Sequence, residues 1–123
     1  MRMQAARGAA NYQAGLLAEA CVAAYYDKAG RSIAARRWRG SQGEIDLVAR
    51  DEDGLIFIEV KRARDFATAA LRLSRRQMDR ICGAASEYLA GEPTGQLTPM
   101  RFDVALVDAM GRVDVIENAF GLN

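Results

Sequence analysis

The sequence predicts one α/β domain, residues 1–123, with helices packed on a mixed central β-sheet and residues 1–12 as a candidate disordered segment. Two segments have apolar residues at helical spacing, and five shorter segments have the composition of β-strands. The chain has 123 residues, half of them hydrophobic, and shows no internal repeat, linker or low-complexity segment. This length and composition suit a single domain with one continuous core.

The expected elements follow in the order α-β-β-β-α-β-β. Residues 15–28 are expected to form the first helix, because apolar residues recur there every three or four positions and Gly30 suits its C-terminal cap. Residues 32–38 have apolar residues among polar neighbours, as in a strand near the edge of a sheet. The strands at residues 44–50 and 55–61 are joined by Asp-Glu-Asp-Gly, which is a strong hairpin signal.

The second half of the chain is expected to complete the sheet. Residues 63–74 are expected to be a loop, and residues 75–89 a helix with one apolar stripe. The sequence Gly-Glu-Pro-Thr-Gly ends this helix. Residues 102–107 and 113–116 are the last two expected strands, on either side of the turn Asp-Ala-Met-Gly. Strands and helices in this order are typical of helices packed on a sheet.

Several classes of function are excluded by residues that the chain lacks. It contains no His, which excludes His-based catalysis and a zinc site of the usual Cys/His kind. We expect Cys21 and Cys82 to be reduced core residues, because they are far apart in sequence. No apolar stretch approaches the roughly 20 residues that span a bilayer, and the N-terminal residues lack the apolar region of a secretory signal. A cytoplasmic location without membrane contact is therefore expected.

Opposite charges gather in different parts of the sequence, although the net charge is only +1. Acids concentrate in the predicted hairpin, and arginines lie around it and at the start of the second helix. An acidic pocket rimmed by arginines suits a metal ion and a polyanion, whereas a solvated surface charge is the simpler interpretation of any one arginine. Trp38 is expected to pack under its strand, with stacking on an unpaired base as the alternative. The candidate nucleic-acid contacts are Arg36, Arg37, Arg39, Arg62, Arg64, Arg75 and Arg76.

The predicted hairpin brings two carboxylates together if its register is even. Alternate residues of a strand point to the same side, so Asp46 shares a face with Glu44, and Glu59 shares one with Lys61. With a two-residue loop Asp46 lies opposite Glu59, and with the pairing shifted by two residues it lies opposite Lys61. Both registers place Asp46, Glu59 and Lys61 on one face. A three-residue loop without a bulge would separate them.

Facing carboxylates point to a metal ion. They repel each other, and burying either one unpaired is costly or forces it to stay protonated. Mg²⁺ resolves this conflict, since it binds one or two carboxylates together with waters and phosphate oxygens. A lysine on the same face can orient a water or stabilise transition-state charge. Lys28 and Lys61 are the only lysines among seventeen Lys and Arg residues, which favours a specific role for Lys61.

An ordinary charged pair on an exposed strand is the alternative explanation for Glu59 and Lys61. Taken alone, Glu-x-Lys is a weak signal. An Asp in one strand, a short acidic turn and Glu-x-Lys at the end of an apolar strand form a more specific combination. We interpret this combination as a catalytic site.

The combination resembles the PD-(D/E)xK motif of restriction-endonuclease-like nucleases. It is most similar to the YraN-type uncharacterised bacterial proteins, which are related to archaeal Holliday-junction resolvases. The resemblance implies a restriction-endonuclease-like fold, with a mixed sheet flanked by helices. It covers nearly the whole chain, in the stretches Gly15 with Glu19, Arg37-Trp38-Arg39, Gly43-Glu44-Ile45-Asp46-Leu47-Val48, Phe57-Ile58-Glu59-Val60-Lys61, Arg101-Phe102-Asp103-Val104 and Asn118-Ala119-Phe120.

Carried over residue by residue, the resemblance implies a metal site and a catalytic lysine. Asp46 and Glu59 would bind Mg²⁺ or Mn²⁺ together with the backbone carbonyl of Val60. Lys61 would be the catalytic lysine. Glu19 matches an acid that contributes to the metal shell in resolvase-like members, and a solvent-facing helix residue is an equal alternative.

Other positions have a weaker correspondence. Glu44 and Gln77 are candidates for a second shell around the metal site, although relatives commonly have Lys where this chain has Gln77. Arg101 and Asp103 are expected to form a structural ion pair. Arg37 departs from the family pattern, because relatives often have Asn at this position. Such changes leave the metal chemistry intact and bear on substrate contacts.

These inferences lead to two hypotheses of function. The first is a Mg²⁺-dependent or Mn²⁺-dependent endonuclease that hydrolyses phosphodiester bonds in DNA, including branched or unusual structures. The alternative is a non-catalytic nucleic-acid-binding protein on the same fold. The expected partner is DNA, with RNA as an open alternative, and a homodimer follows if two strands are cut symmetrically.

Overall fold

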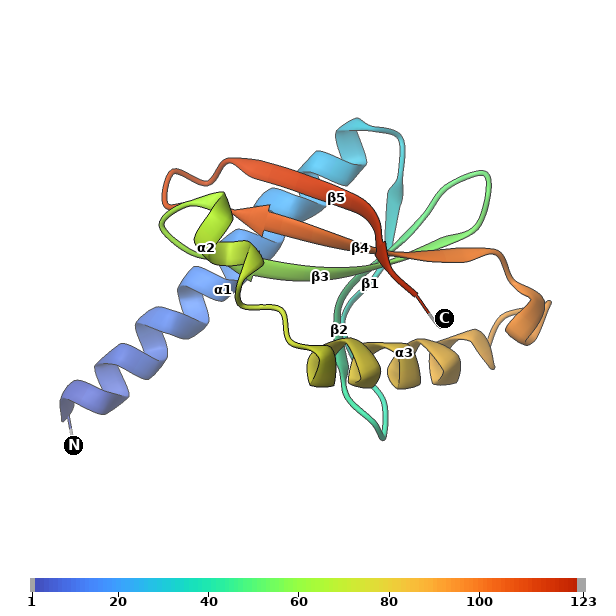
Figure 1. The fold of residues 1–123 in the computed structure, drawn as a ribbon, viewed down its shortest axis with the longest axis horizontal. Helices are drawn as coiled ribbons and strands as arrows, with labels where there is room; N and C mark the ends of the chain where they lie inside the picture. Colours follow the sequence, from blue (N-terminus) through green and yellow to red (C-terminus); the bar gives the residue numbers. More distant parts are fainter. Residues whose placement is uncertain (1, 122–123) are drawn as a thin grey trace.

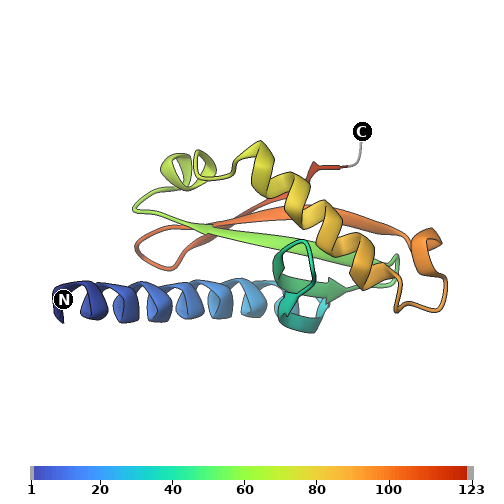
Figure 2. The same cartoon turned by 90° about the horizontal axis from the view of Figure 1, so that it is seen from below.

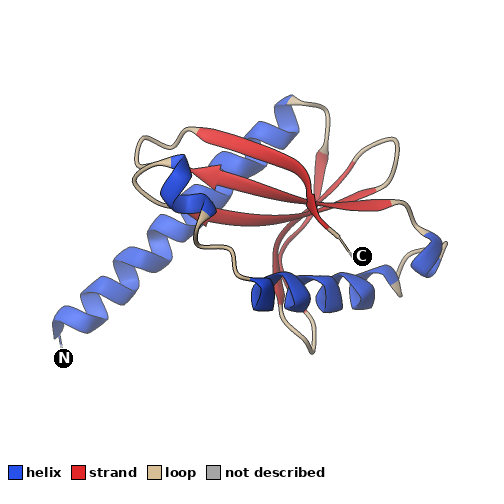
Figure 3. Cartoon of the chain, viewed as in Figure 1, coloured by secondary structure: helices blue, strands red, loops and turns tan. Residues whose placement is uncertain are grey.

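A five-stranded mixed sheet forms the centre of the structure (Figures 1 and 3). The computed structural model describes residues 2–121, and side chains from residue 8 onward. Its strands lie in their sequence order, with β3 and β4 parallel and the other neighbours antiparallel. The strands are β1 (Ser32–Arg39), β2 (Glu44–Arg50), β3 (Leu55–Arg62), β4 (Met100–Val107) and β5 (Val113–Phe120).

Helices cover both faces of this sheet. The long helix α1 (Arg2–Lys28) lies on one face, and α3 (Arg75–Leu89) lies on the other (Figure 2). The crossover between the parallel strands β3 and β4 also contains α2 (Phe66–Ala70) and a single 3-10 turn (Gly95–Leu97), in segments expected to be loops. The predicted fold class, a mixed α/β sheet flanked by helices, is confirmed.

Helix α1 is longer than predicted. The sequence predicts its start at residue 15, but it begins at Arg2. Residues 2–14 are rich in Ala, Met, Gln and Arg, which favour helix without any tertiary contact. Residues 8–13 are exposed, and this half of α1 extends past the sheet (Figure 2). The candidate disordered segment 1–12 is therefore helical from residue 2, and Met1 lies outside the described residues.

Both faces of the sheet bury apolar side chains. One core cluster lies under α1 and includes Val22, Tyr26 and Ile58. The other lies under α3 and includes Phe57 and Ile81. Because β3 is covered on both sides, its first five residues are all buried. This explains the continuous apolar run that precedes the acidic end of the strand.

Strand β5 extends to Phe120, four residues beyond its predicted end. Its last residue stacks on Phe102 of β4, with ring centroids 4.9 Å apart. Asn118 has a φ of 51° and donates its backbone N–H to Asp103 Oδ1 at 3.0 Å. The extension therefore depends on contacts with β4 that the local sequence does not reveal.

The predicted ion pair of Arg101 and Asp103 is confirmed. Arg101 Nε donates to Asp103 Oδ1 at 3.0 Å, and the Tyr26 hydroxyl donates to Asp103 Oδ2 at 2.7 Å. Asp103 is fully buried, so these bonds compensate for its desolvation. Their role is to hold α1 against β4.

The two cysteines are both free, as expected, but neither is fully buried. Cys82 packs against the cluster under α3, whereas Cys21 lines an open groove beside α1. The expectation of a core position is therefore wrong for Cys21. None of the helices in the described part of the chain is long and apolar enough to cross a membrane.

Candidate active site

The β2–β3 hairpin has the two-residue loop of the first register considered above. Arg50 pairs with Leu55, and the Asp51 N–H donates to the Gly54 carbonyl at 3.0 Å. Gly54 has a φ of 152°, and a Cβ there would lie 2.1 Å from the carbonyl oxygen of Pro99. This turn therefore requires glycine, because no larger residue fits against the segment that leads into β4.

The paired part of the hairpin ends at Leu47 and Ile58. The next residues in the same register are Asp46 and Glu59, which places them opposite each other. Here β2 stays with β1 while β3 stays with β4, and the two strands separate (Figure 1). Asp46 bridges the opening, since its Oδ2 accepts a hydrogen bond from the Val60 N–H at 2.8 Å.

Glu59 and Lys61 lie two residues apart on β3 and form an ion pair. The Lys61 Nζ is 3.0 Å from Glu59 Oε1, and only 14% and 10% of the two side chains are exposed. Solvent screening is weak at such exposure, so the pair is more than a surface contact. The structure therefore brings Asp46, Glu59 and Lys61 together at the point where β2 and β3 separate.

The pKa of Asp46 is raised by its surroundings. Burial raises this pKa first, and the negative charge of Glu59 raises it further, to about 7. The Val60 N–H and the Lys61 ammonium act in the opposite direction but do not cancel the increase. The charged form of Asp46 is therefore disfavoured beside Glu59, which is what a bound cation would reverse.

Glu19 of α1 faces the same acidic region but is held by an arginine. Arg37 Nε donates to Glu19 Oε2 at 2.8 Å. Burial raises the pKa of Glu19, the Arg37 hydrogen bond lowers it, and the charges of Asp46 and Glu44 raise it. Arg37 has a φ of 48°, a left-handed conformation that Asn adopts more readily than Arg. This conformation would suit Asn better than Arg.

The oxygen atoms at the site are of the kind that a hard divalent cation prefers. Two carboxylates, Asp46 and Glu59, and the backbone carbonyl of Val60 fit Mg²⁺ or Mn²⁺, which complete their coordination with water. No group of three or more His, Cys, Asp or Glu side chains is arranged around a possible ion in the described residues. A metal ion would thus be bound by two carboxylates, unless the hydrogen bond between Glu19 and Arg37 breaks and Glu19 becomes a third ligand.

The two candidates for a second shell have other contacts in the structure. Glu44 accepts a hydrogen bond from Arg39 at 3.2 Å. The Gln77 side chain accepts from the Ser74 N–H at 3.3 Å while the Ser74 hydroxyl accepts from the Gln77 N–H at 3.1 Å. This reciprocal capping box begins α3. Gln77 therefore has a structural role at the helix start.

The predicted nucleic-acid arginines are spread over several elements. Arg37, Arg39 and Arg64 pair with Glu19, Glu44 and Asp65, respectively. Such pairs are weak where they are exposed, as they are for Arg39 and Arg64. Arg62 donates to the Asn11 carbonyl at 3.1 Å. The exposed side chains without a contact described here are Arg36, Arg75 and Arg76.

Trp38 packs into the core rather than projecting as a stacking platform. Its ring makes an edge-to-face contact with Tyr88 of α3, with centroids 5.3 Å apart. It also packs against the cluster under α3. The expectation that Trp38 packs under its strand is confirmed.

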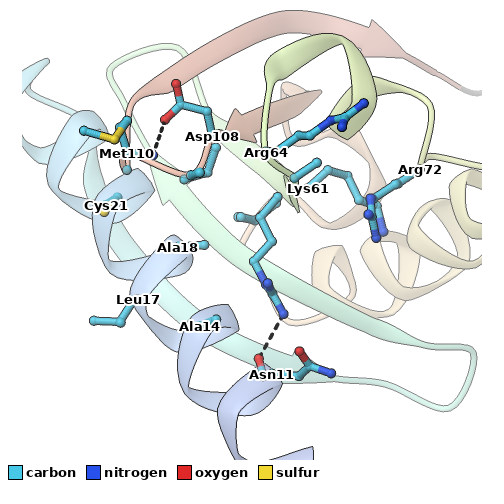
Figure 4. A pocket seen from close by; sticks show the side chains of 16 residues that line it. Asn11, Ala14, Leu17, Ala18, Cys21, Lys61, Arg64, Arg72, Asp108 and Met110 are labelled. Atoms are coloured by element: carbon cyan, nitrogen blue, oxygen red, sulfur yellow. Dashed lines mark hydrogen bonds between the residues drawn. The ribbon is translucent and has the colours of Figure 1, made fainter. Parts of the chain in front are cut away.

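Sequence reasoning missed the groove that Lys61 lines between α1 and the ends of β3 and β4 (Figure 4). Its apolar side comes from α1, and its basic side includes Arg72 from the segment expected to be a loop. The exposed Leu17 of α1 was a possible signal, since it departs from a simple core-facing stripe. The position of α1 relative to β3 could not be inferred from that residue.

Comparison with known proteins identifies a family. The model described as "Uncharacterised protein family UPF0102" matches residues 18–107. A UPF0102 protein from Cereibacter sphaeroides (strain ATCC 17029 / ATH 2.4.9) is 67% identical over 113 residues, which cover 92% of this chain and 97% of that protein. A UPF0102 protein from Ruegeria pomeroyi is 56% identical over 121 residues, which cover 98% of each chain. Another, from Dinoroseobacter shibae, is 41% identical over 117 residues, covering 95% of this chain and 87% of that protein.

Among solved structures, the crystal structure of a repair endonuclease from Pyrococcus abyssi is similar to part of this chain. The TM-score is 0.40 and the identity 19%, over 63% of this chain. The matched part spans 30% of the length of that endonuclease. A similarity of this extent does not establish a shared activity.

Proposed function

This chain belongs to the uncharacterised protein family UPF0102, and we propose that it is a metal-dependent nuclease. The reaction is hydrolysis of phosphodiester bonds in DNA, and the metal is Mg²⁺ or Mn²⁺. Branched or otherwise unusual DNA structures belong to the proposed substrate range.

One observation carries this proposal. Asp46 is held beside Glu59 by the Val60 N–H, where burial and the charge of Glu59 raise its pKa to about 7. Placing two carboxylates side by side in a partly buried position costs stability, and Lys61 and the Val60 N–H offset only part of this cost. A divalent ion would remove the repulsion, and the ammonium of Lys61 already lies 3.0 Å from one of the two carboxylates.

Each residue of the site has a defined role in this proposal. Asp46, Glu59 and the Val60 carbonyl would hold the metal, which when bound supplies charge neutralisation and lowers the pKa of a coordinated water. Lys61 would position the attacking water and balance the charge that develops on the phosphate. Glu19 would add a third carboxylate if Arg37 transferred its guanidinium to a phosphate.

A second candidate is a nucleic-acid-binding protein that does not cleave. The ion pair between Glu19 and Arg37 favours it, because this pair keeps a third carboxylate away from the metal position. The presence of Asp46, Glu59 and Lys61 in one place favours the nuclease, because binding alone does not require two adjacent carboxylates, one buried and one partly buried.

Metal titration with a panel of DNA substrates tests the two candidates. Linear, flapped and four-way DNA are incubated with the full chain under increasing Mg²⁺ or Mn²⁺, and cleavage is compared with that of Asp46→Asn and Glu59→Gln. Asp53→Asn is the matched control, since Asp53 is an exposed carboxylate of the hairpin turn. We expect only the control to cleave like the wild type. Binding without cleavage under every metal and substrate would support the second candidate, and a mass measurement on DNA would test the homodimer.

A further inference from the structure

Lys61 lines an open groove of about 1300 Å³, and neither Asp46 nor Glu59 is among the residues that line it. The groove lies between α1 and the segments that follow β3 and β4 (Figure 4). Figure 4 shows α1 along one side and Arg64 and Arg72 on the opposite side. The groove therefore presents a surface of mixed character beside the proposed catalytic lysine.

One side of the groove is cationic. It contains Lys61, Arg62, Arg64 and Arg72, with a single carboxylate, Asp108. Asp108 accepts hydrogen bonds from the Met110 and Arg112 backbone N–H groups, each at 2.9 Å, and from Arg112 Nε at 2.6 Å. This carboxylate closes the β4–β5 turn, and its charge is balanced by Arg112. Lys61 and Arg64 pair with Glu59 and Asp65, so the positive field in the groove comes mainly from Arg62 and Arg72.

The opposite side of the groove is apolar. It consists of Ala14, Leu17, Ala18 and Cys21 of α1, together with Met110 of the β4–β5 turn. Leu17 is 68% exposed and Met110 is 81% exposed. Large side chains with such exposure beside a basic wall are typical of a binding surface rather than of a core.

We propose that this groove holds an unpaired strand of nucleic acid that leads to Lys61, an inference that rests on the proposed nuclease function. A duplex presents phosphates and sugars on its outside and keeps its bases stacked inside, so an apolar wall would contact little of it. An unpaired strand exposes its phosphates to one side and its bases to the other. Arg62, Arg64 and Arg72 contact the phosphates, while Leu17 and Met110 contact the bases.

Arg62 provides a way for the strand to enter. Its guanidinium reaches from β3 across to α1, where it donates to the Asn11 carbonyl at 3.1 Å. A phosphate oxygen is a stronger acceptor than a neutral carbonyl, because it carries charge. The arriving strand therefore replaces Asn11 as the partner of Arg62. The proposed substrate class is DNA with an unpaired segment next to the bond that is cut.

The test measures binding without cleavage. The full chain is titrated in EDTA with a labelled oligothymidine and, separately, with a blunt hairpin duplex, and binding is followed by fluorescence anisotropy. Leu17→Asp and Met110→Asp are expected to weaken binding of the unpaired strand about tenfold, as loss of base contacts does, and to leave duplex binding unchanged. Leu97→Asp is the matched control, because Leu97 is 88% exposed and does not line the groove.

A charge variant tests the basic side separately. Arg72→Ala is expected to reduce the salt dependence of unpaired-strand binding by about 0.7 in the log–log slope, the value of one phosphate contact. Lys28→Ala removes one exposed cation outside the groove and is expected to leave this slope unchanged. Thermal melting of each variant verifies that the fold is retained.

Three outcomes would overturn the groove assignment. Equal weakening of unpaired and duplex DNA would show that the groove does not distinguish bases. Unchanged binding in Leu17→Asp and Met110→Asp would show that the strand lies elsewhere. Self-association, or tighter binding of an acidic amphipathic peptide that competes with the strand, would identify a protein as the occupant. If the wild type binds the unpaired strand in the groove but never cleaves it, the nuclease proposal is refuted and the groove proposal is retained. If the wild type cleaves DNA and the groove variants cleave it equally well, the groove proposal is refuted and the nuclease proposal is retained.

Discussion

Asp46 Oδ2 accepts the backbone N–H of Val60 at 2.8 Å. Asp46 is one residue from the last paired residue of β2, and Val60 is two residues beyond the last paired residue of β3. A side chain thus joins two strands whose backbones have already separated. The bond satisfies a part-buried donor that would otherwise lack its strand partner. It also directs the Asp46 carboxylate toward Glu59, and the predictions below depend on this arrangement.

Asp46→Asn is expected to abolish stabilisation by divalent metal. Saturating Mg²⁺ or Mn²⁺ is expected to raise the free energy of unfolding of the wild type by about 1–3 kcal/mol, because it binds the native state alone. The Asn side chain can still accept from Val60, and it relieves repulsion with Glu59, so the metal-free variant is expected to melt at the same temperature or slightly higher. Thermal melts with and without metal measure both effects, with Asp53→Asn as the control. A full response of Asp46→Asn to Mg²⁺ would show that Asp46 is not a ligand.

Stability without metal is expected to fall as pH rises from about 4 to 7. Asp46 has an ordinary pKa of 3.8, which burial first and the Glu59 charge second raise to about 7 in the folded state. Within this window the folded state binds more protons than the unfolded state, so raising the pH favours unfolding. Urea unfolding in EDTA measures the slope. Asp46→Asn is expected to remove this contribution, and an identical pH dependence in the variant would contradict the assignment.

Lys61→Arg is expected to retain DNA binding and to lose most cleavage. The Lys61 side chain is largely buried and its Nζ contacts Glu59. The larger, planar guanidinium of Arg would therefore place the positive charge of this side chain at a different position. A displacement of about 1 Å costs on the order of 100-fold in rate. Single-turnover cleavage measures the rate, and binding is measured separately in Ca²⁺.

Lys28→Arg is the matched control for this substitution. Lys28 is exposed at the end of α1, and its replacement is expected to change neither cleavage nor binding. An equally active Lys61→Arg would show that Lys61 is only a phosphate anchor, because Arg grips phosphate at least as well as Lys.

Replacing Arg36, Arg37 and Arg39 together by Ala is expected to flatten the salt dependence of duplex binding. Each phosphate contact contributes about 0.9 to the log–log slope, since binding releases counterions. Arg37 and Arg39 must first break their ion pairs with Glu19 and Glu44 before they can bind phosphates. Arg36 is exposed and can bind a phosphate directly. Anisotropy titrations over a range of salt concentrations measure the slope. An unchanged slope would show that β1 faces away from the nucleic acid.

Arg37→Val is expected to be more destabilising than Arg37→Asn. Both variants lose the ion pair with Glu19, but φ at this position is 48°. The left-handed conformation costs a residue with a Cβ roughly 1–2 kcal/mol, more for β-branched side chains and less for Asn. Urea unfolding compares the two variants. Equal stabilities would mean that the backbone relaxes out of this conformation.

The helices and strands with strong local signals could be predicted. The apolar stripe of α3 is a local pattern, and the observed bounds of this helix equal the predicted ones. The hairpin turn was equally clear, because an acidic run ending in Gly54 separates two apolar strands. The ends of α1 and β5 were not predictable in this way. The first half of α1 is exposed and depends on helix propensity, and the end of β5 depends on the stacking of Phe120 on Phe102.

The sequence by itself determined which side chains share a face within each strand, because side chains alternate. Grouping Asp46 with Glu59 and Lys61 also required an even register between the strands, and the structure has the two-residue loop that provides it. Only the tertiary structure decided that, beyond the paired part of the hairpin, β2 stays paired with β1 and β3 stays paired with β4. This separation opens a space between β2 and β3, across which Asp46 accepts a hydrogen bond from Val60. It also decided that Arg37 holds Glu19 and that α1 forms a groove beside Lys61. These features join residues far apart in the chain, and their energies depend on burial and distance, which no local pattern specifies.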